Sequence, residues 1–261
     1  MNIFIGIDIG GTTINIGFVS EEKQLLSEKV IETMPEKGPE EAIRRIGLSI
    51  EQMIAASHNK DDFKGVGIGL PGLLDIEKGM IIEASNLPGW QGFSIVSALN
   101  SKILLPVFIE NDANLAALGE YWMGAGTNAS NLFMITLGSG IGGALLVNGK
   151  FFKLHPSAGE FGHMIIEKSG ATCTCGRRGC LETFVSKHGF MRLVKEKMPF
   201  KPNTSLNKYE ITSISPQVIA QLAKEGDELA NVIYQEAGEA LGIAISNVIN
   251  LTGVSLIIIG G

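Results

Sequence analysis

The sequence predicts an α/β protein in which one structural plan occurs twice. Residues 3–19 and 132–147 each contain an apolar run, a glycine-rich turn and a second apolar run. This pattern indicates β-hairpins, because apolar strands joined by a short glycine turn pair with each other. Elsewhere, short apolar runs alternate with long segments of helical periodicity, which is typical of the α/β class.

The first half of the chain is expected to contain several strands and two helices. The predicted strands are 3–9, 14–19, 25–31, 66–70 and 107–109. Residues 39–57 predict an amphipathic helix, because apolar side chains recur there every three or four positions. These side chains are Ile43, Ile46, Ile50, Met53 and Ile54.

A second helix is predicted over residues 112–123, with Asn111 or Asp112 as its N-cap, since both side chains accept hydrogen bonds from free helical N–H groups. Its apolar side is expected to comprise Ala116, Leu118, Tyr121 and Trp122.

The second half begins with the second hairpin and contains a long helix over residues 228–251. A strand is predicted over residues 254–259, directly before Gly260 and Gly261. Glycines after a buried strand are typical of the start of a loop, so we expect further elements beyond this point; an end on an exposed strand is the alternative. The polar stretch 199–216 is expected to be mobile.

Composition and charge indicate a soluble globular protein of the cytoplasm. The chain has 261 residues, enough for one large domain or two of ordinary size, and its net charge of −6 argues against a nucleic-acid partner. No apolar run approaches the roughly 18 residues that a membrane helix needs. The N-terminus lacks the basic region of a signal peptide, and three clustered cysteines do not resemble a disulfide framework.

The two glycine turns, residues 8–13 and 138–143, are candidate phosphate sites. Glycine lets a backbone approach an anion closely, and the N–H dipoles of the turn then meet the negative charge. Either hairpin alone fits an ordinary tight turn. Two hairpins with one layout, and an acid, Asp8, directly before the first glycine pair, favour a polyphosphate held between two halves.

The three cysteines, Cys173, Cys175 and Cys180, lie close together in sequence, and His163 precedes them. Three cysteines and one histidine are a common closed ligand set for structural Zn²⁺. Gly176 and Gly179 lie between the second and third cysteine and let the backbone fold tightly enough for all three sulfurs to reach one ion. Three free thiols are the alternative. The remaining histidines, with no ligand context, are expected at the surface: His58, His155 and His188.

Four motifs together resemble the ROK family, which groups bacterial sugar kinases with sugar-responsive repressors. They are DIGGTT at 8–13, ENDANLAALGE at 110–120, GEFGH at 159–163 and CTCGRRGCLE at 173–182. The resemblance implies the duplicated, ribonuclease H-like fold of actin and hexokinase, with a cleft between two lobes. We expect the lobes to cover residues 1–112 and 113–261.

The resemblance also implies a sugar site. Asp112 aligns with the family's catalytic base, although a plain helix N-cap is the alternative role. The positions that resemble substrate contacts are Gly72, Asn86, Asn111, Asp112, Glu160, His163 and Glu182. The two glutamates could otherwise be surface acids, and nearby Trp90 fits the core as well as the sugar.

On the ATP side, Asp8 resembles the acid that holds Mg²⁺ through water, as suits an ion that dehydrates reluctantly. The expected phosphate and nucleotide contacts are Gly10, Gly11, Thr12, Thr13, Gly138, Ser139, Gly260 and Gly261. A Walker loop is absent from the sequence, which excludes that class of nucleotide site.

The resemblance therefore implies an ATP-dependent hexose kinase, a homodimer with glucose as the favoured substrate. Kinases for N-acetylmannosamine, fructose or another hexose remain open. A repressor is not expected, because the first strand begins at residue 3 and the chain is acidic. A sugar-binding protein without turnover is the third possibility, motivated by the apparently missing C-terminal elements.

Overall fold

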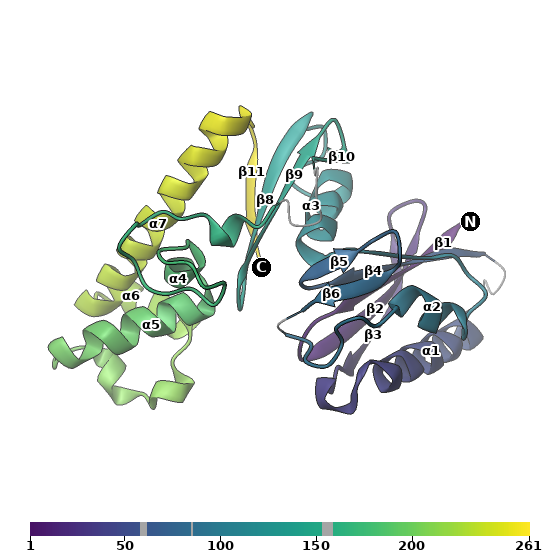
Figure 1. The fold of residues 1–261 in the computed structure, drawn as a ribbon, viewed down its shortest axis with the longest axis horizontal. Coiled ribbons are helices and arrows are strands. Elements are labelled where there is room, and N and C mark those ends of the chain that lie inside the picture. Colours follow the sequence, from purple (N-terminus) through teal and green to yellow (C-terminus); the bar gives the residue numbers. More distant parts are fainter. Residues whose placement is uncertain (58–61, 85, 153–158) are drawn as a thin grey trace. The chain divides into compact units, whose positions relative to one another are not determined.

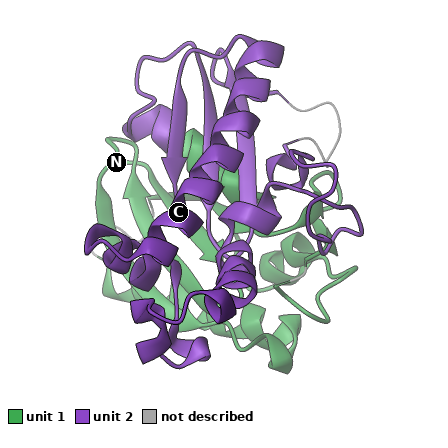
Figure 2. Cartoon of the chain, turned by 90° about the vertical axis from the view of Figure 1, so that its left-hand side faces the viewer, with its two compact units in different colours: residues 1–119, 154–157 green, residues 120–153, 158–261 purple. Residues whose placement is uncertain are grey.

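The computed structural model describes residues 1–57, 62–84, 86–152 and 159–261 (Figure 1). The chain forms two compact α/β units. Of the described residues, those up to Gly119 belong to the first unit and those from Glu120 onwards to the second (Figure 2). The boundary between functional lobes that is expected between residues 112 and 113 stays a prediction.

The first unit contains, among its described residues, a five-stranded sheet in the order β3-β2-β1-β4-β7. Its strands are β1 (Ile3–Ile9), β2 (Thr13–Ser20), β3 (Leu25–Glu32), β4 (Phe63–Leu70) and β7 (Val107–Asn111). β1, β2 and β3 pair antiparallel, whereas β4 runs parallel to β1 and β7 runs parallel to β4. The remaining elements are the 3-10 helix η1 (Pro35–Lys37), α1 (Pro39–Ala56), β5 (Leu73–Asp75), β6 (Met80–Glu83) and α2 (Ile95–Asn100).

Strand alternation positions the core of this unit. Along β1 the isoleucines at every second position are buried, while the residues between them, Asp8 included, are exposed. Ile43, Ile46 and Ile50 of α1 join the same core, as their helical spacing predicts. Trp90 is fully buried in it, so of the two roles open to this residue the structure supports the core.

The second unit repeats the plan with a sheet in the order β10-β9-β8-β11, again among the described residues. Its strands are β8 (Asn131–Leu137), β9 (Ile141–Val147), β10 (Lys150–Phe151) and β11 (Ile257–Gly260). β10, β9 and β8 pair antiparallel, and β11 runs parallel to β8. The order β3-β2-β1-β4 therefore recurs, strand for strand, and the repeat that the two hairpins predict is confirmed.

Helices follow β10 in this unit. They are the 3-10 helix η2 (Phe161–His163), α4 (Glu182–Val185), α5 (Lys187–Lys197), α6 (Pro216–Lys224) and α7 (Glu228–Thr252). α7 shares a hydrophobic core with β8 and β9. Asp227 is the N-cap of α7, and its carboxylate accepts a hydrogen bond from the Ala230 N–H. No helix in the described ranges combines the length and the apolar character needed to cross a membrane.

One expectation about a single element is wrong. α3 (Asp112–Met123) has the predicted bounds, but Ala113 and Ala117 are its buried residues, while Leu118 and Trp122 are 37% and 40% exposed. The chain passes from β7 into α3 with no intervening loop, and this fixes which side of the helix faces inwards. Three 3-10 helices, Met198–Phe200, Ser205–Lys208 and Ile211–Ser213, lie in or at the edge of the stretch 199–216, whose expected mobility stays a prediction.

Candidate active site

The first glycine turn joins β1 to β2 and is closed by a hydrogen bond from the Gly10 N–H to the Thr13 carbonyl, 2.9 Å long. Asp8 lies at the end of β1, where its side chain is exposed. Asn15 pairs with Asp8 across the hairpin and donates its Nδ2–H to Asp8 Oδ2 at 3.3 Å. This contact holds one carboxylate oxygen and leaves Asp8 at the surface of the turn.

Thr33, a buried residue that follows β3, holds the same turn by hydrogen bonds to its backbone carbonyls. The Thr33 N–H donates to the Thr12 carbonyl at 2.8 Å, and Thr33 Oγ1 donates to the Gly10 carbonyl at 2.6 Å. The carbonyl of Thr33 accepts in turn from the guanidinium of Arg45 on α1. Thr33 and Arg45 were not singled out by sequence, because neither belongs to a glycine motif.

Within the first unit, one predicted substrate position lies against this turn and two others contact each other. The backbone of Gly11 lies so close to Asn86 that a Cβ there would be 3.0 Å from the Asn86 carbonyl oxygen. Asn111 Nδ2 donates to the Gly72 carbonyl at 3.3 Å. Gly72 has φ of +92°, and a Cβ on it would lie 2.2 Å from the Glu83 carbonyl oxygen, so only glycine fits.

Asp112 is the first residue of α3 and its side chain is exposed. Asn111 acts as the N-cap, because its Oδ1 accepts from the N–H groups of Ala113 and Asn114 at 3.0 and 3.2 Å. Asp112 Oδ1 also accepts from the Ala113 N–H, at 2.8 Å. Asp112 is therefore oriented by the start of the helix without being the side chain that caps it.

Glu110 stiffens this strand-to-helix junction. Its Oε1 accepts from the Asn111 N–H and from Asn114 Nδ2, each at 2.9 Å. Both contacts orient residues next to Asp112. Residues 110–114 thus form a hydrogen-bonded corner between β7 and α3. The sequence pattern did not reveal that Glu110 and Asn114 stabilise this corner.

The second glycine turn joins β8 to β9, with the Gly138 N–H donating to the Gly140 carbonyl at 2.9 Å. Glu182, expected as a sugar contact, lies against this turn: its Oε2 accepts from the Ile141 N–H at 3.1 Å. The end of the chain reaches the same region, because a Cβ on Gly261 would lie 2.2 Å from the Leu137 carbonyl oxygen.

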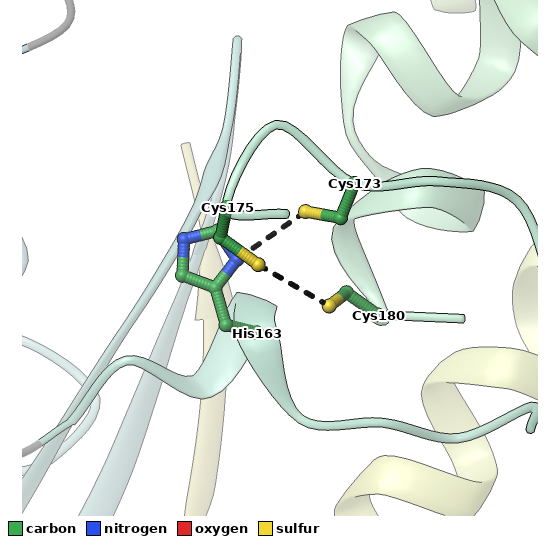
Figure 3. A group of neighbouring side chains, drawn as sticks. All are labelled: His163, Cys173, Cys175 and Cys180. Carbon is green, nitrogen blue, oxygen red and sulfur yellow. Dashed lines mark hydrogen bonds between the residues drawn. The ribbon is translucent and has the colours of Figure 1, made fainter. Parts of the chain in front are cut away.

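The predicted metal ligands converge within the second unit (Figure 3). One ligand atom from each of His163, Cys173, Cys175 and Cys180 can be chosen so that all lie within 4.8 Å of one another. His163 Nδ1 lies 3.5 Å from Cys173 Sγ, and the sulfurs of Cys175 and Cys180 lie 3.7 Å apart. The cysteines are free thiols, not disulfides.

Two of these separations are close to those expected around a tetrahedral zinc ion. Zn–S bonds of about 2.3 Å and Zn–N bonds of about 2.05 Å place two sulfurs about 3.8 Å apart and a sulfur and a nitrogen about 3.6 Å apart. The observed separations of 3.7 and 3.5 Å agree within about 0.1 Å. The donor set is closed and leaves no open position for a catalytic water, so a metal here would be structural.

The loop that carries the thiols needs its glycines. Gly176 and Gly179 have φ of +84° and +69°, and a Cβ on Gly179 would lie 1.6 Å from the Glu167 carbonyl oxygen. Burial raises the pKa of the Cys180 thiol to about 12. Burial also acts to raise the pKa of Cys175, but hydrogen bonds with the Arg177 backbone and the other two thiols lower it by more.

His163 connects this cluster with Glu160. Its Nδ1 faces the sulfurs, while its Nε2 lies 3.9 Å from Glu160 Oε2, and the two side chains are 26% and 50% exposed. A histidine bound to metal through one nitrogen usually directs the other at a carboxylate or water. Of the other histidines, His188 is exposed as expected, and His58 and His155 lie outside the described residues.

Two α/β units of one sheet order, each with a glycine turn after its first strand, define the duplicated fold of the actin and hexokinase class. The chain belongs to the ROK family: the family's sequence profile matches residues 4–261. A glucokinase from Halalkalibacterium halodurans is 34% identical, with 99% of this chain and 79% of that protein covered.

Two further comparisons mark the breadth of the family. The crystal structure of a ROK family glucokinase from Streptomyces griseus in complex with glucose and AMPPNP has a TM-score of 0.81 and 31% identity, covering 100% of this chain and 83% of that one. A xylose repressor from Caldicellulosiruptor bescii is 32% identical, with 98% of this chain and 65% of the repressor covered.

Proposed function

We propose that this protein transfers the γ-phosphoryl group of ATP to a hydroxyl group of a hexose, with glucose as the favoured acceptor and Asp112 as the general base. The protein is an ATP-dependent hexose kinase by its family and its glucokinase relatives. The observation that carries the assignment of the base is the exposed carboxylate of Asp112, which is set at the start of α3 beside the capping Asn111.

Asp112 would take the proton of the hydroxyl group whose oxygen attacks the γ-phosphorus, while the bond between that phosphorus and the bridging oxygen of ADP breaks. General-base assistance contributes typically about 10²–10⁴ in rate. Asp8 would hold Mg²⁺ through water, and the ion would neutralise charge on the phosphates. The two glycine turns would align the phosphates for transfer, with Thr12, Thr13 and Ser139 as hydroxyl donors.

For the cysteine cluster we propose one structural Zn²⁺, bound by His163 and the three cysteines. The distances between donor atoms support this ion. The bound ion would fix the loop between His163 and Cys180 and so orient Glu160 and Glu182. It would take no part in phosphoryl transfer, because its four positions are filled by protein.

Glu160→Gln should raise the KM for the hexose roughly ten- to hundredfold and leave the KM for ATP within about twofold. The carboxylate would accept hydrogen bonds from sugar hydroxyls, and a bond to a charged group contributes about 1.5–3 kcal/mol. Steady-state kinetics with each substrate varied in turn measure both constants. Glu167→Gln changes an exposed acid of the same region and serves as the control. A similar rise in both constants would show that Glu160 acts through the fold.

A coupled assay across a hexose panel tests the proposed function. ADP release is followed with glucose, mannose, fructose, N-acetylglucosamine and N-acetylmannosamine, and the highest kcat/KM is expected for glucose. A higher value for another sugar would reassign the acceptor. No turnover with any sugar would favour a sugar-binding protein without catalysis. The homodimer that the family resemblance implies is tested on the same preparation by light scattering.

A further inference from the structure

We propose that Glu182 is a positioning residue for the second phosphate turn and that it transmits the state of the cysteine cluster to that turn. The inference rests on the proposed function for the meaning of the turn, but the contacts are properties of the second unit alone. Glu182 would thus serve ATP binding as well as the sugar site in which its motif places it.

The contact between Glu182 and the turn is close and specific. Glu182 Oε2 accepts from the Ile141 N–H at 3.1 Å. The carboxylate also lies over Gly140, where a Cβ would be 2.6 Å from the same oxygen. Gly140 therefore leaves the space that the carboxylate occupies, and the pairing of this glycine with this acid fixes the exit of the turn into β9.

The entrance of the turn is held by the next helix. The Lys187 N–H, at the start of α5, donates to the Gly138 carbonyl at 3.0 Å. Ser186 Oγ donates to the Glu182 carbonyl at 2.7 Å and joins the two attachment points. The turn is thus bonded on both sides to the short segment that contains α4 and the start of α5. Its conformation depends on where that segment lies.

The same segment begins at a metal ligand. Cys180 precedes Glu182 by two residues, and Thr183 donates to the Cys180 carbonyl through both its N–H, at 3.0 Å, and its Oγ1, at 2.8 Å. Cys180 is fully buried, so its position is set by the packing and by the other ligands. Loss of metal would remove one of these two constraints on Cys180 and so loosen the position of the carboxylate that holds the turn.

The first glycine turn is held in a similar way, which supports the inference that Glu182 acts as a brace. By a brace we mean a residue outside the hairpin that fixes the conformation of the turn by hydrogen bonds. Thr33 binds the carbonyls of Gly10 and Thr12 there, from outside the hairpin. Each turn is thus held by a side chain of another segment, a hydroxyl in one unit and a carboxylate in the other. A preformed turn loses less conformational entropy when phosphate binds, which is the physical advantage of a brace.

Three single variants and one double variant distinguish the support of the turn by Glu182 from its role in sugar binding. Glu182→Ala removes the acceptor, and AMPPNP affinity in calorimetry should fall about three- to tenfold, the usual value of one hydrogen bond. Glu182→Gln keeps an acceptor oxygen, so AMPPNP affinity should stay within about twofold while sugar affinity falls. Gly140→Ala should displace the Glu182 carboxylate and weaken AMPPNP binding as much as Glu182→Ala does. The double variant, Gly140→Ala with Glu182→Ala, should bind AMPPNP no more weakly than either single variant.

Hydrogen exchange of the peptide that carries Ile141 tests the brace without any nucleotide. Exchange should be faster in Glu182→Ala and in protein stripped of metal by a chelator, and unchanged in the control Glu167→Ala. Unchanged exchange in both, or unchanged AMPPNP affinity in Glu182→Ala with weaker sugar binding, would overturn the proposal. Failure of the proposed function would give a different result. The wild-type protein would then bind no AMPPNP, although its Ile141 amide would still be protected from hydrogen exchange.

Discussion

Asp112→Asn is expected to lower kcat by at least about 10²-fold while the affinity for the hexose stays close to that of the wild type. The amide keeps the size of the side chain and one acceptor oxygen, so the contact with the Ala113 N–H survives. It cannot accept the proton of the attacking hydroxyl group. Steady-state kinetics give kcat, and calorimetry with sugar alone gives the affinity.

Asp75→Asn is a suitable control for this experiment, because it also removes one carboxylate of the first unit, a surface acid paired with Lys78. Turnover of that variant should match the wild type. If Asp112→Asn retained turnover within a few-fold of the wild type, another group would be taking the proton. If the variant lost sugar binding as well, the loss of turnover would be explained by a role of Asp112 in binding the sugar, and its role as a base would lack support.

The second large effect is expected at the cysteine cluster. Protein purified without added metal should contain about one zinc ion per chain by elemental analysis, and Cys175→Ala should contain far less. Cys175 is exposed, so its truncation removes a ligand without opening a cavity in the core. Because metal binding contributes about 10–16 kcal/mol to folding in small zinc peptides, the loop should lose its order in the variant.

Limited proteolysis measures that loss of order, with cleavage expected between His163 and Cys180. Lys168→Ala alters an exposed residue of the same loop and should keep both the zinc and the resistance to protease. Wild-type protein without zinc, or Cys175→Ala with unchanged zinc content, would contradict the assignment. Either result would leave the cluster as three thiols brought together by the loop alone.

The sequence predicts the framework of this fold well, because its signals are local. Alternating isoleucines define β1, and the helical stripe of Ile43, Ile46 and Ile50 defines α1. The two glycine turns identify the repeat, and the strand order in both units follows it. The ligand cluster is also predictable, because three of its four members lie close together in sequence.

What the sequence does not predict depends on contacts between distant segments. Thr33 reaches the first turn from the end of β3, and Glu182 reaches the second turn from a helix far along the chain. No periodicity marks such contacts. The inward face of α3 was predicted wrongly for a related reason: two small residues, Ala113 and Ala117, pack where larger apolar side chains were expected. Small side chains give little pattern, yet they permit close packing.

The central claim, phosphoryl transfer to a hexose, is tested most directly by following the γ-phosphoryl group itself. Metal-loaded protein is incubated with glucose and ATP labelled at the γ-phosphate, and the products are separated by chromatography. The label is expected in a hexose phosphate, with one labelled hexose phosphate formed for each ADP. With Asp112→Asn, the rate of this transfer is expected to be at least about 10²-fold lower. Label released as inorganic phosphate, or retained in ATP by protein that binds both glucose and AMPPNP, would contradict the account.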